Sequence, residues 1–209
     1  MSHSIYNRHF LLRRLHSLLG VVPLGAFLIL HLWENAQARL GPERFNAAVA
    51  ELQQINYLTA IEILFIALPL VLHAGYGLVV IGSGNSEPLR YPYARNWLYW
   101  SQRISGIALI AFLALHVSLT RVAGALDPEI YRDLFGYMQQ SLSHPLTFTL
   151  YLVGLWLAVL HLANGLSTAA IVWGLTTDAA AQRRFGYVCV AFGLTLGIIG
   201  TQGLIGFLQ

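Results

Sequence analysis

The chain has 209 residues, of which 56% are hydrophobic and only 10% are charged, and its net charge is +3. A soluble domain carries about 25% charged residues, so the composition excludes an ordinary soluble protein and predicts a membrane protein. The single cysteine, Cys189, excludes both a disulfide framework and a cysteine-ligated cluster. All twelve basic residues are arginines, which we interpret as charges that orient the chain in a membrane rather than as a surface for nucleic acid.

Five long apolar runs, separated by polar loops, lie at about 11–36, 57–81, 98–120, 145–174 and 185–208. Each is long enough to cross a bilayer, which takes about 20 residues, and helices satisfy the backbone of such segments within lipid. The sequence therefore predicts an all-α membrane protein in which residues 1–209 form one domain, a bundle of five transmembrane helices. The two largest loops, 37–56 and 122–144, are expected to hold short interfacial helices at 43–52 and 130–140.

The arginines are divided unequally between the two sides of such a bundle. Eight lie on the side of the N-terminus: Arg8, Arg13, Arg14, Arg90, Arg95, Arg103, Arg183 and Arg184. Four lie on the opposite side: Arg39, Arg44, Arg121 and Arg132. Because cytoplasmic loops carry an excess of positive charge, we expect the N-terminus to be cytoplasmic and the C-terminus to be on the outer side.

Four of the five runs each contain a histidine at membrane depth, and the helical rise of about 1.5 Å per residue converts their spacing into depth. His31 and His116 both lie close to the outer ends of their runs, so they can meet at one level; we call them the outer pair. His73 lies somewhat nearer the inner end of its run. His161 is near the middle of a long run and is assigned to the inner half by elimination. We call His73 and His161 the inner pair.

Two pairs of histidines, each drawn from two different helices, favour bis-histidine ligation of two stacked haem groups. Gly77 and Gly165 follow the inner histidines by four residues, which places a glycine on the same helix face as the imidazole, and we expect these glycines to make room for a flat macrocycle. The alternative is that each histidine only forms a hydrogen bond to a neighbouring helix. Four histidines on four helices at two matched depths favour the haem interpretation.

The inner ends of the runs supply candidates for contacts with haem propionates, which arginines bind well. These candidates are Arg13, Arg14, Arg103 and His16. The position of His16 beside the two N-terminal arginines leaves three roles open: axial ligand, propionate partner or interfacial histidine.

Several longer motifs are distinctive: RRLHSLLGVVPLGAFLILH, EILFIALPLVLHAGYG, YARNWLYWSQRISG, LHLANG and VWG. With these motifs, almost the whole chain resembles the cytochrome b membrane-anchor subunit of bacterial succinate:menaquinone oxidoreductases, the single-chain type with five helices and two haems b. The resemblance implies that His73 and His161 ligate a proximal haem and that His31 and His116 ligate a distal haem. His16 matches a family histidine that is not an axial ligand.

The resemblance also implies partners and a direction of electron flow. A flavoprotein subunit would oxidise succinate, an iron–sulfur subunit would pass electrons to the proximal haem, and the distal haem would deliver them to menaquinone near the outer face of the bacterial cytoplasmic membrane. Related two-haem fumarate reductases carry a glutamate two residues before the ligand of the fourth run, where this chain has Val159. That difference favours succinate oxidation as the direction.

A menaquinone site needs an apolar slot with a few polar groups. The candidates near the outer pair are Trp33, Glu34, Asn35, Tyr57 and Glu62. An ordinary interfacial belt is the alternative for Trp33 and Glu34, and an ion pair with Arg39 or Arg121 is the alternative for Glu62.

Two other classes of protein share some of these features. One is the quinol-oxidising cytochrome b subunit of a fumarate reductase, a hydrogenase or a formate dehydrogenase, which the attached soluble partner would distinguish. The other is a transporter or a retinal protein with buried histidines. The absence of lysine excludes a retinal Schiff base, which requires an amine, and a purified transporter would be colourless.

Overall fold

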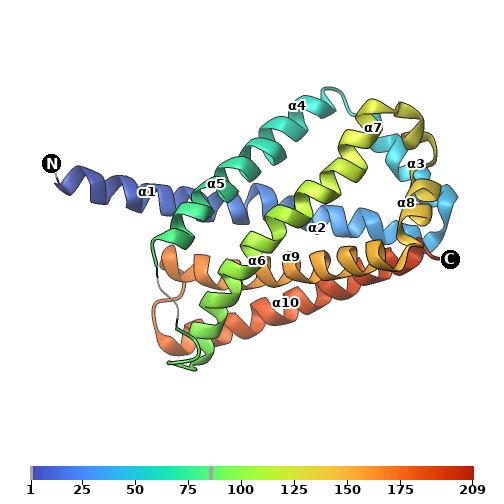
Figure 1. The fold of residues 1–209 in the computed structure, drawn as a ribbon. Helices are drawn as coiled ribbons and strands as arrows, with labels where there is room; N and C mark the ends of the chain where they lie inside the picture. Colours follow the sequence, from blue (N-terminus) through green and yellow to red (C-terminus); the bar gives the residue numbers. More distant parts are fainter. Residues whose placement is uncertain (1, 85–86) are drawn as a thin grey trace.

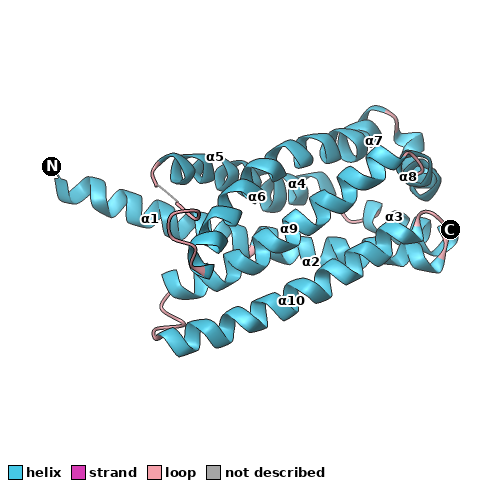
Figure 2. Cartoon of the chain, turned by 60° about the horizontal axis from the view of Figure 1, so that its bottom comes forward, coloured by secondary structure: helices cyan, strands magenta, loops and turns pink. Residues whose placement is uncertain are grey.

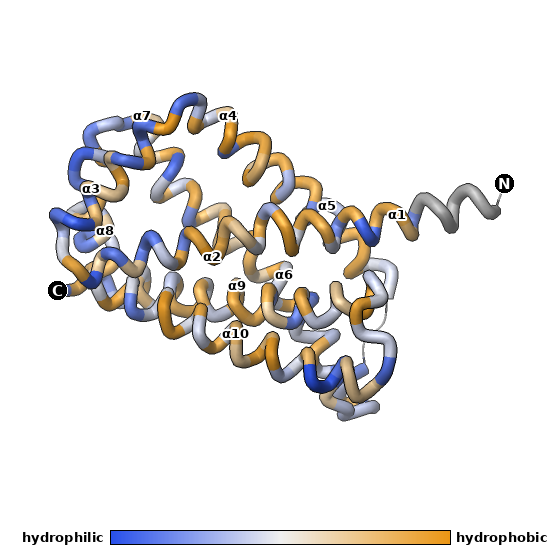
Figure 3. The backbone as a smooth tube through the Cα atoms, turned by 180° about the vertical axis from the view of Figure 1, so that it is seen from behind, coloured by the Kyte–Doolittle hydropathy of each residue, from blue (hydrophilic) through white to orange (hydrophobic). Residues whose placement is uncertain are grey.

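The computed structural model describes residues 2–84 and 87–209, with side chains from residue 9 onward, and these residues form helices without any strand. Five helical segments in the described ranges are long and apolar enough to cross a membrane: His9–Leu40, Leu58–Gly82, Ala94–Leu126, Pro145–Val172 and Ala179–Gly206. This confirms the predicted all-α fold with five spans (Figures 1 and 2). Hydrophobic residues dominate the long helices, and hydrophilic residues gather where the chain turns (Figure 3).

The first span is one long helix that is interrupted at Val22. It consists of α1 (Ser2–Val21), α2 (Pro23–Ala36) and a terminal 3₁₀ turn, η1 (Gln37–Leu40). Pro23 explains the interruption, because proline lacks the backbone N–H that the helix would use there. The chain nevertheless stays helical through this point, since the Val22 amide still donates to the Leu18 carbonyl at 2.9 Å.

The second and third spans each contain a π-helical turn near the same end of the bundle. The second span is α4 (Leu58–Glu62), the π-turn η2 (Ile63–Ala67) and α5 (Leu68–Gly82). The third is α6 (Ala94–Val117), the π-turn η3 (Ser118–Val122) and α7 (Ala123–Leu126). Pro69 follows η2 and removes one amide from the ladder. In η3, Ser118 and Thr120 bond back to the carbonyls of Ala114 and His116, which competes with regular helix geometry.

Short helices cover the end of the bundle where the C-terminus lies. They are α3 (Pro42–Gln53), η4 (Pro128–Asp133) and α8 (Leu134–Leu142), and they occupy the two loops in which interfacial helices were expected. Phe45 of α3, Phe135 of α8 and Phe207 from the C-terminus pack edge to face or tilted, with ring centroids 4.9–6.2 Å apart. This aromatic cluster fastens both loops to the end of the last span.

The fourth and fifth spans, α9 (Pro145–Val172) and α10 (Ala179–Gly206), lie side by side along their lengths (Figure 1). A column of buried glycines on α10 permits this approach: Gly193, Gly197, Gly200, Gly203 and Gly206. A Cβ at Gly193 would lie 2.9 Å from the Cβ of Ala163 on α9, and one at Gly203 would lie 2.9 Å from the Asn35 carbonyl oxygen on α2. Small residues that let backbones approach are typical of helix contacts in membranes. The fifth span therefore ties the fourth span to the first.

The two chain termini lie at opposite ends of the bundle, as an odd number of spans requires (Figure 1). We call these ends the N-terminal end and the C-terminal end. Residues 83–84, 87–93 and 173–178 lie at the N-terminal end, and the short helices α3 and α8 lie at the C-terminal end.

Candidate functional site

The four membrane histidines come from four different helices and meet in two pairs. In the outer pair, His31 of α2 and His116 of α6 have ring centroids 5.7 Å apart, with an angle of 78° between the ring planes. In the inner pair, His73 of α5 and His161 of α9 have centroids 6.1 Å apart at an angle of 85°. These are the two pairings that the depth argument predicts. The fifth span contributes no histidine and serves as a packing helix.

Hydrogen bonds fix the tautomers of both inner-pair imidazoles. The Nδ1 of His73 lies 2.9 Å from the backbone carbonyl oxygen of His16, and because a carbonyl only accepts, this Nδ1 carries the proton. The Nδ1 of His161 lies 3.0 Å from the hydroxyl oxygen of Ser105, which donates its own proton to the Gln102 carbonyl at 3.1 Å. That Nδ1 therefore also donates. Both rings consequently have a protonated Nδ1 and a free lone pair on Nε2.

His16 packs directly against His73. The two rings stack with centroids 4.0 Å apart and planes within 6° of parallel. The Nδ1 of His16 donates to the His73 carbonyl at 2.9 Å, which mirrors the bond made in the opposite direction. The sequence leaves three roles open for His16. The geometry adds a fourth, because His16 clamps α1 to α5 beside the inner pair.

Glycines of neighbouring helices make room for the inner imidazoles. A Cβ at Gly20 of α1 would overlap the ring of His73, and one at Gly106 of α6 would lie 3.2 Å from Cε1 of His161. Gly77 faces His16 at 3.3 Å, and Gly165 faces the side chain of Gln102 at 3.4 Å. Each imidazole therefore rests against a glycine of a neighbouring helix rather than beside one on its own helix.

The outer pair is held more by aromatic contact than by hydrogen bonds. Phe27 stacks against His31 with centroids 5.2 Å apart, and Phe112 stacks against His116 at 5.7 Å. The Asn35 amide donates to the His31 backbone carbonyl at 2.8 Å and lies 3.4–3.5 Å from the ring nitrogens. Within the described residues, the buried Nδ1 of His116 has no hydrogen-bond partner. The outer imidazoles are thus less firmly oriented than the inner ones.

The three candidate arginines occupy different environments at the N-terminal end. Arg14 lies over the rings of Phe10 and Trp173, at 4.5 and 5.1 Å from their centroids. Arg103 donates to the carbonyls of Gly84 and Val80 at 2.6 and 3.3 Å, so it caps the C-terminus of α5. The side chain of Arg13 is exposed.

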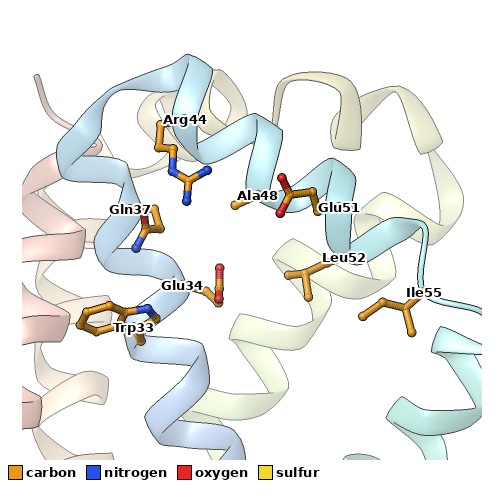
Figure 4. Close-up of a pocket in the computed structure, with 8 residues that line it drawn as sticks. All are labelled: Trp33, Glu34, Gln37, Arg44, Ala48, Glu51, Leu52 and Ile55. Atoms are coloured by element: carbon orange, nitrogen blue, oxygen red, sulfur yellow. The ribbon is translucent and has the colours of Figure 1, made fainter.

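The five candidate quinone residues do not form one group. Trp33 and Glu34 of α2 line a cavity of about 310 Å³ at the C-terminal end, and its other lining residues are Gln37, Arg44, Ala48, Glu51, Leu52 and Ile55. Glu34, Arg44 and Glu51 point toward the same space between α2 and α3 (Figure 4). Asn35 instead contacts His31, and Tyr57 is exposed in a left-handed conformation with φ 60°.

Sequence reasoning missed the α3 side of this cavity. Arg44 and Glu51 are seven residues apart, and that spacing places them on the same face of a helix. The expected interfacial helix at 43–52 already contained this signal. What the spacing does not reveal is that this face turns toward α2.

Glu62 is paired with Arg121, one of its two expected alternatives. Its Oε2 lies 2.7 Å from an Nη and 2.9 Å from the Nε of Arg121. Two nitrogens of the guanidinium therefore contact the same carboxylate oxygen. Arg121 also donates to the Tyr131 hydroxyl at 3.0 Å. The contact joins the second span, directly before its π-turn η2, to the third span, within its π-turn η3.

Comparison with known proteins identifies the family of this chain. Residues 85–200 match the family described as the succinate dehydrogenase/fumarate reductase transmembrane subunit. The chain is also 38% identical over 201 residues to the succinate dehydrogenase cytochrome b558 subunit of Bacillus subtilis (strain 168), an alignment that covers 96% of this chain and 98% of the relative. These matches confirm the resemblance seen in the motifs. The chain belongs to the family of succinate dehydrogenase/fumarate reductase transmembrane subunits.

Proposed function

We propose that this chain is the two-haem cytochrome b membrane anchor of a succinate dehydrogenase. The observation that carries the proposal is the meeting of four imidazoles from four helices in two pairs, with centroid separations of 5.7 and 6.1 Å. The family membership and the cytochrome b558 relative support haem b as the group that these histidines bind.

The histidine pairs fit a metal held between them. A bond from histidine nitrogen to zinc is about 2.0–2.1 Å long, so two imidazoles that shared one metal ion of similar size would have ring centroids up to about 6 Å apart. The inner imidazoles have their Nε2 lone pairs free, because both Nδ1 atoms donate elsewhere. Hydrogen bonds of this kind orient ligating histidines and raise their basicity. The donor set therefore fits two bis-histidine haems.

Each part of the chain has a distinct task in this function. A haem with two axial imidazoles has no open position and supplies one-electron transfer rather than oxygen binding. His73 and His161 would hold the haem nearer the iron–sulfur subunit, with Ser105 and the His16 carbonyl keeping both rings oriented. His31 and His116 would hold the haem nearer the quinone. Succinate would be oxidised on the flavoprotein partner, outside this chain.

The orientation and the direction of electron flow are part of the same proposal. The N-terminal end, which carries most of the arginines, would face the cytoplasm and the two soluble subunits, in the cytoplasmic membrane of a bacterium. Val159, at the position where fumarate reductases carry a glutamate, is buried and lies 3.5 Å from the Cβ position of Gly193 on α10. An apolar contact between two helices supports succinate oxidation without a proton route along α9.

The cavity between α2 and α3 is the best candidate for the menaquinone site. Its volume of about 310 Å³ is at the lower end of the range of small-molecule pockets, about 300–1,000 Å³. Trp33, Leu52 and Ile55 supply apolar walls, and Glu34 and Glu51 supply carboxyl groups for proton transfer beside the guanidinium of Arg44. Trp33 and Glu34 follow His31 by two and three residues on α2, so the cavity lies near the outer pair.

Spectroscopy of the purified complex tests the main proposal. We expect two low-spin haems b per chain in the reduced-minus-oxidised spectrum and in a haem-to-protein ratio. His31→Ala and His116→Ala should each remove only the outer haem, and His144→Ala, an exposed residue at the start of α9, should remove none. One haem per chain, a high-spin spectrum or joint loss of both haems in an assembled complex would contradict the proposal.

The quinone site is tested by removing single carboxyl groups from the cavity. Glu34→Gln and Glu51→Gln should slow menaquinone reduction while succinate still reduces both haems. Glu43→Gln is the matched control, because Glu43 is an exposed residue of the same short helix α3 and is not part of the cavity lining. Unchanged quinone kinetics in both cavity variants would place the site elsewhere.

A further inference from the structure

The ion pair between Glu62 and Arg121 lies in an unusual structural setting. Glu62 is the last residue of α4, directly before the π-turn η2, and Arg121 lies within the π-turn η3. Inside α-helices, π-turns are rare and occur frequently at functional sites. Both charged side chains are about two-thirds covered, with relative exposures of 30% for Glu62 and 37% for Arg121, although each lies within a membrane span.

Neighbouring residues hold this pair in place from several directions. The Tyr131 hydroxyl accepts from Arg121 at 3.0 Å, and Tyr131 fits there because Gly124 has no side chain that would overlap its ring. The Tyr137 hydroxyl donates to the Leu119 carbonyl at 2.9 Å, which satisfies one acceptor of the distorted turn. The guanidinium is therefore positioned by η4 and α8 as well as by the carboxylate.

The pair is also coupled to the outer pair of histidines. Arg121 follows His116 by five residues, a distance of about 7.5 Å along a helix at about 1.5 Å per residue. Thr120, its neighbour, donates to the His116 carbonyl at 2.7 Å. On the second span, eleven residues separate Glu62 from His73, or about 16 Å along the helix axis. The two charges are thus much closer to the outer site than to the inner site.

We propose that Glu62 and Arg121 are positioning residues that set the reduction potential of the outer bis-histidine site through two nearly compensating charges. This inference rests on the proposed haem function. Reduction adds an electron, so a positive charge near the site favours the reduced form and a negative charge opposes it. In a membrane, where the effective dielectric constant is low, such a charge acts over a longer range than in water. In contact, the two charges largely cancel, and removing one exposes the other.

The test is a potentiometric titration of both haems in the assembled complex, with every variant measured at the same pH. Glu62→Gln should raise the midpoint potential of the outer haem, and Arg121→Gln should lower it. The double variant should return close to the wild-type value. The inner haem should not shift in any of them. Glu129→Gln is the matched control, because Glu129 pairs with Arg132 at the same end of the bundle but is 65% exposed, where water and salt screen its charge.

Several outcomes separate this inference from the proposed function. Shifts in the same direction in both single variants, equal shifts of the two haems, or no shift of the outer haem would overturn it. If a single variant loses the outer haem, exchanging the charges with Glu62→Arg and Arg121→Glu should restore that haem, and failure to restore it overturns the inference. A wild-type complex with only one haem would overturn both proposals, whereas a two-haem complex with unresponsive potentials overturns this one alone.

Discussion

His16 and His73 clamp the first and second spans together with two reciprocal hydrogen bonds, because each imidazole donates its Nδ1 proton to the backbone carbonyl of the other at 2.9 Å. The rings stack between these bonds at 4.0 Å. Neither bond involves Nε2, so the clamp orients His73 without occupying the nitrogen that a metal would need. The first span thereby contributes one imidazole, His31, to the outer pair and a support, His16, to the inner pair.

Gly20 makes this clamp possible, because it lies one turn beyond His16 and borders the His73 ring. Gly20→Ala should displace His73 and weaken or abolish the inner haem, since the new Cβ would overlap the imidazole and overpacking typically costs about 1–3 kcal/mol. The haem-to-protein ratio and the spectrum of the complex measure this. Gly75→Ala is the control, because nothing lies within 4 Å of its Cβ position. Normal inner-haem content in Gly20→Ala would contradict the packing described for α1 and α5.

Ser105 is expected to matter to the inner haem although it is no ligand. Its hydroxyl is the Nδ1 partner of His161 and is almost completely buried, at 1% exposure. Ser105→Ala should cost about 0.5–1.5 kcal/mol of stability and shift the inner haem's potential, because the imidazole loses basicity without its acceptor. Ser105→Thr should retain the wild-type potential more closely. Potentiometric titration measures both variants, and an unaffected inner haem in Ser105→Ala would exclude this role.

The glycine column of α10 predicts a cost for substitutions in a helix that contributes no histidine to either pair. Gly203→Ala would place a Cβ 2.9 Å from the Asn35 carbonyl oxygen, and since backbone must then move, we expect a loss of about 1–3 kcal/mol. On the same helix, the nearest atom to the Cβ position of Gly186 is 3.7 Å away, so Gly186→Ala should be neutral or slightly stabilising. Thermal unfolding of the complex in detergent compares the two. Equal stabilities would contradict the close approach of α10 to α2.

Asp133 predicts a dependence on pH at the C-terminal end. The Gly136 amide and the Asn46 side chain, which donate to its carboxylate at 3.0 and 2.9 Å, hold the pKa of Asp133 below its usual range. A lowered pKa means that the carboxylate stabilises the folded state fully above the ordinary value of about 3.9 and loses this effect as the pH falls through the lowered value. Hydrogen exchange in α8 should therefore accelerate below about pH 4.

The control for this pH effect is Asp133→Asn, which preserves the size of the side chain and cannot titrate. Its hydrogen exchange in α8 should be independent of pH over the same range once the intrinsic exchange rate is subtracted. An identical acceleration in the wild type and in Asp133→Asn would assign the effect to another group. The Asn46 link is specific, since its Oδ1 also accepts from the Phe135 amide at 3.0 Å and so joins α3 to α8.

If menaquinone is reduced near the outer pair, the membrane potential should assist succinate oxidation. Electrons moving outward across a membrane that is negative inside are driven by the potential, by about 2.3 kcal/mol per charge at 100 mV, or roughly 4–5 kcal/mol for two electrons. An uncoupler should then slow succinate oxidation by menaquinone in oriented vesicles with fixed substrate pools. An unchanged rate would place quinone reduction at the N-terminal end, near His16, Arg14 and Arg103.

The sequence predicts best those features that depend only on position along the chain. Hydropathy finds the five spans, and the rise per residue places His31 level with His116, because depth along a helix depends only on counting. Rotation about the helix axis is different. That Gly77 faces His16 and Gly20 borders His73 depends on how two helices cross, which residue spacing along one chain does not determine. The π-turns also escaped prediction, although Pro69 and the pair Ser118 and Thr120 were visible as local causes.

Side-chain partners across loops were equally beyond the sequence. Glu62 had two arginines within plausible reach, and only the fold selects Arg121 over Arg39. The α3 side of the cavity was missed for a related reason, since the charges of an interfacial helix face water by default, and its attachment through Phe45 turns them toward α2.

The close approach of Gly203 to the Asn35 carbonyl and of Gly206 to the Arg39 amide has a consequence for the outer pair. Asn35 also donates to the backbone carbonyl of His31, so the backbone that α10 presses against is the backbone that holds an outer imidazole. A larger side chain at Gly203 would push on this turn of α2. The geometry of the outer pair therefore depends on side-chain size in a helix that carries none of its histidines.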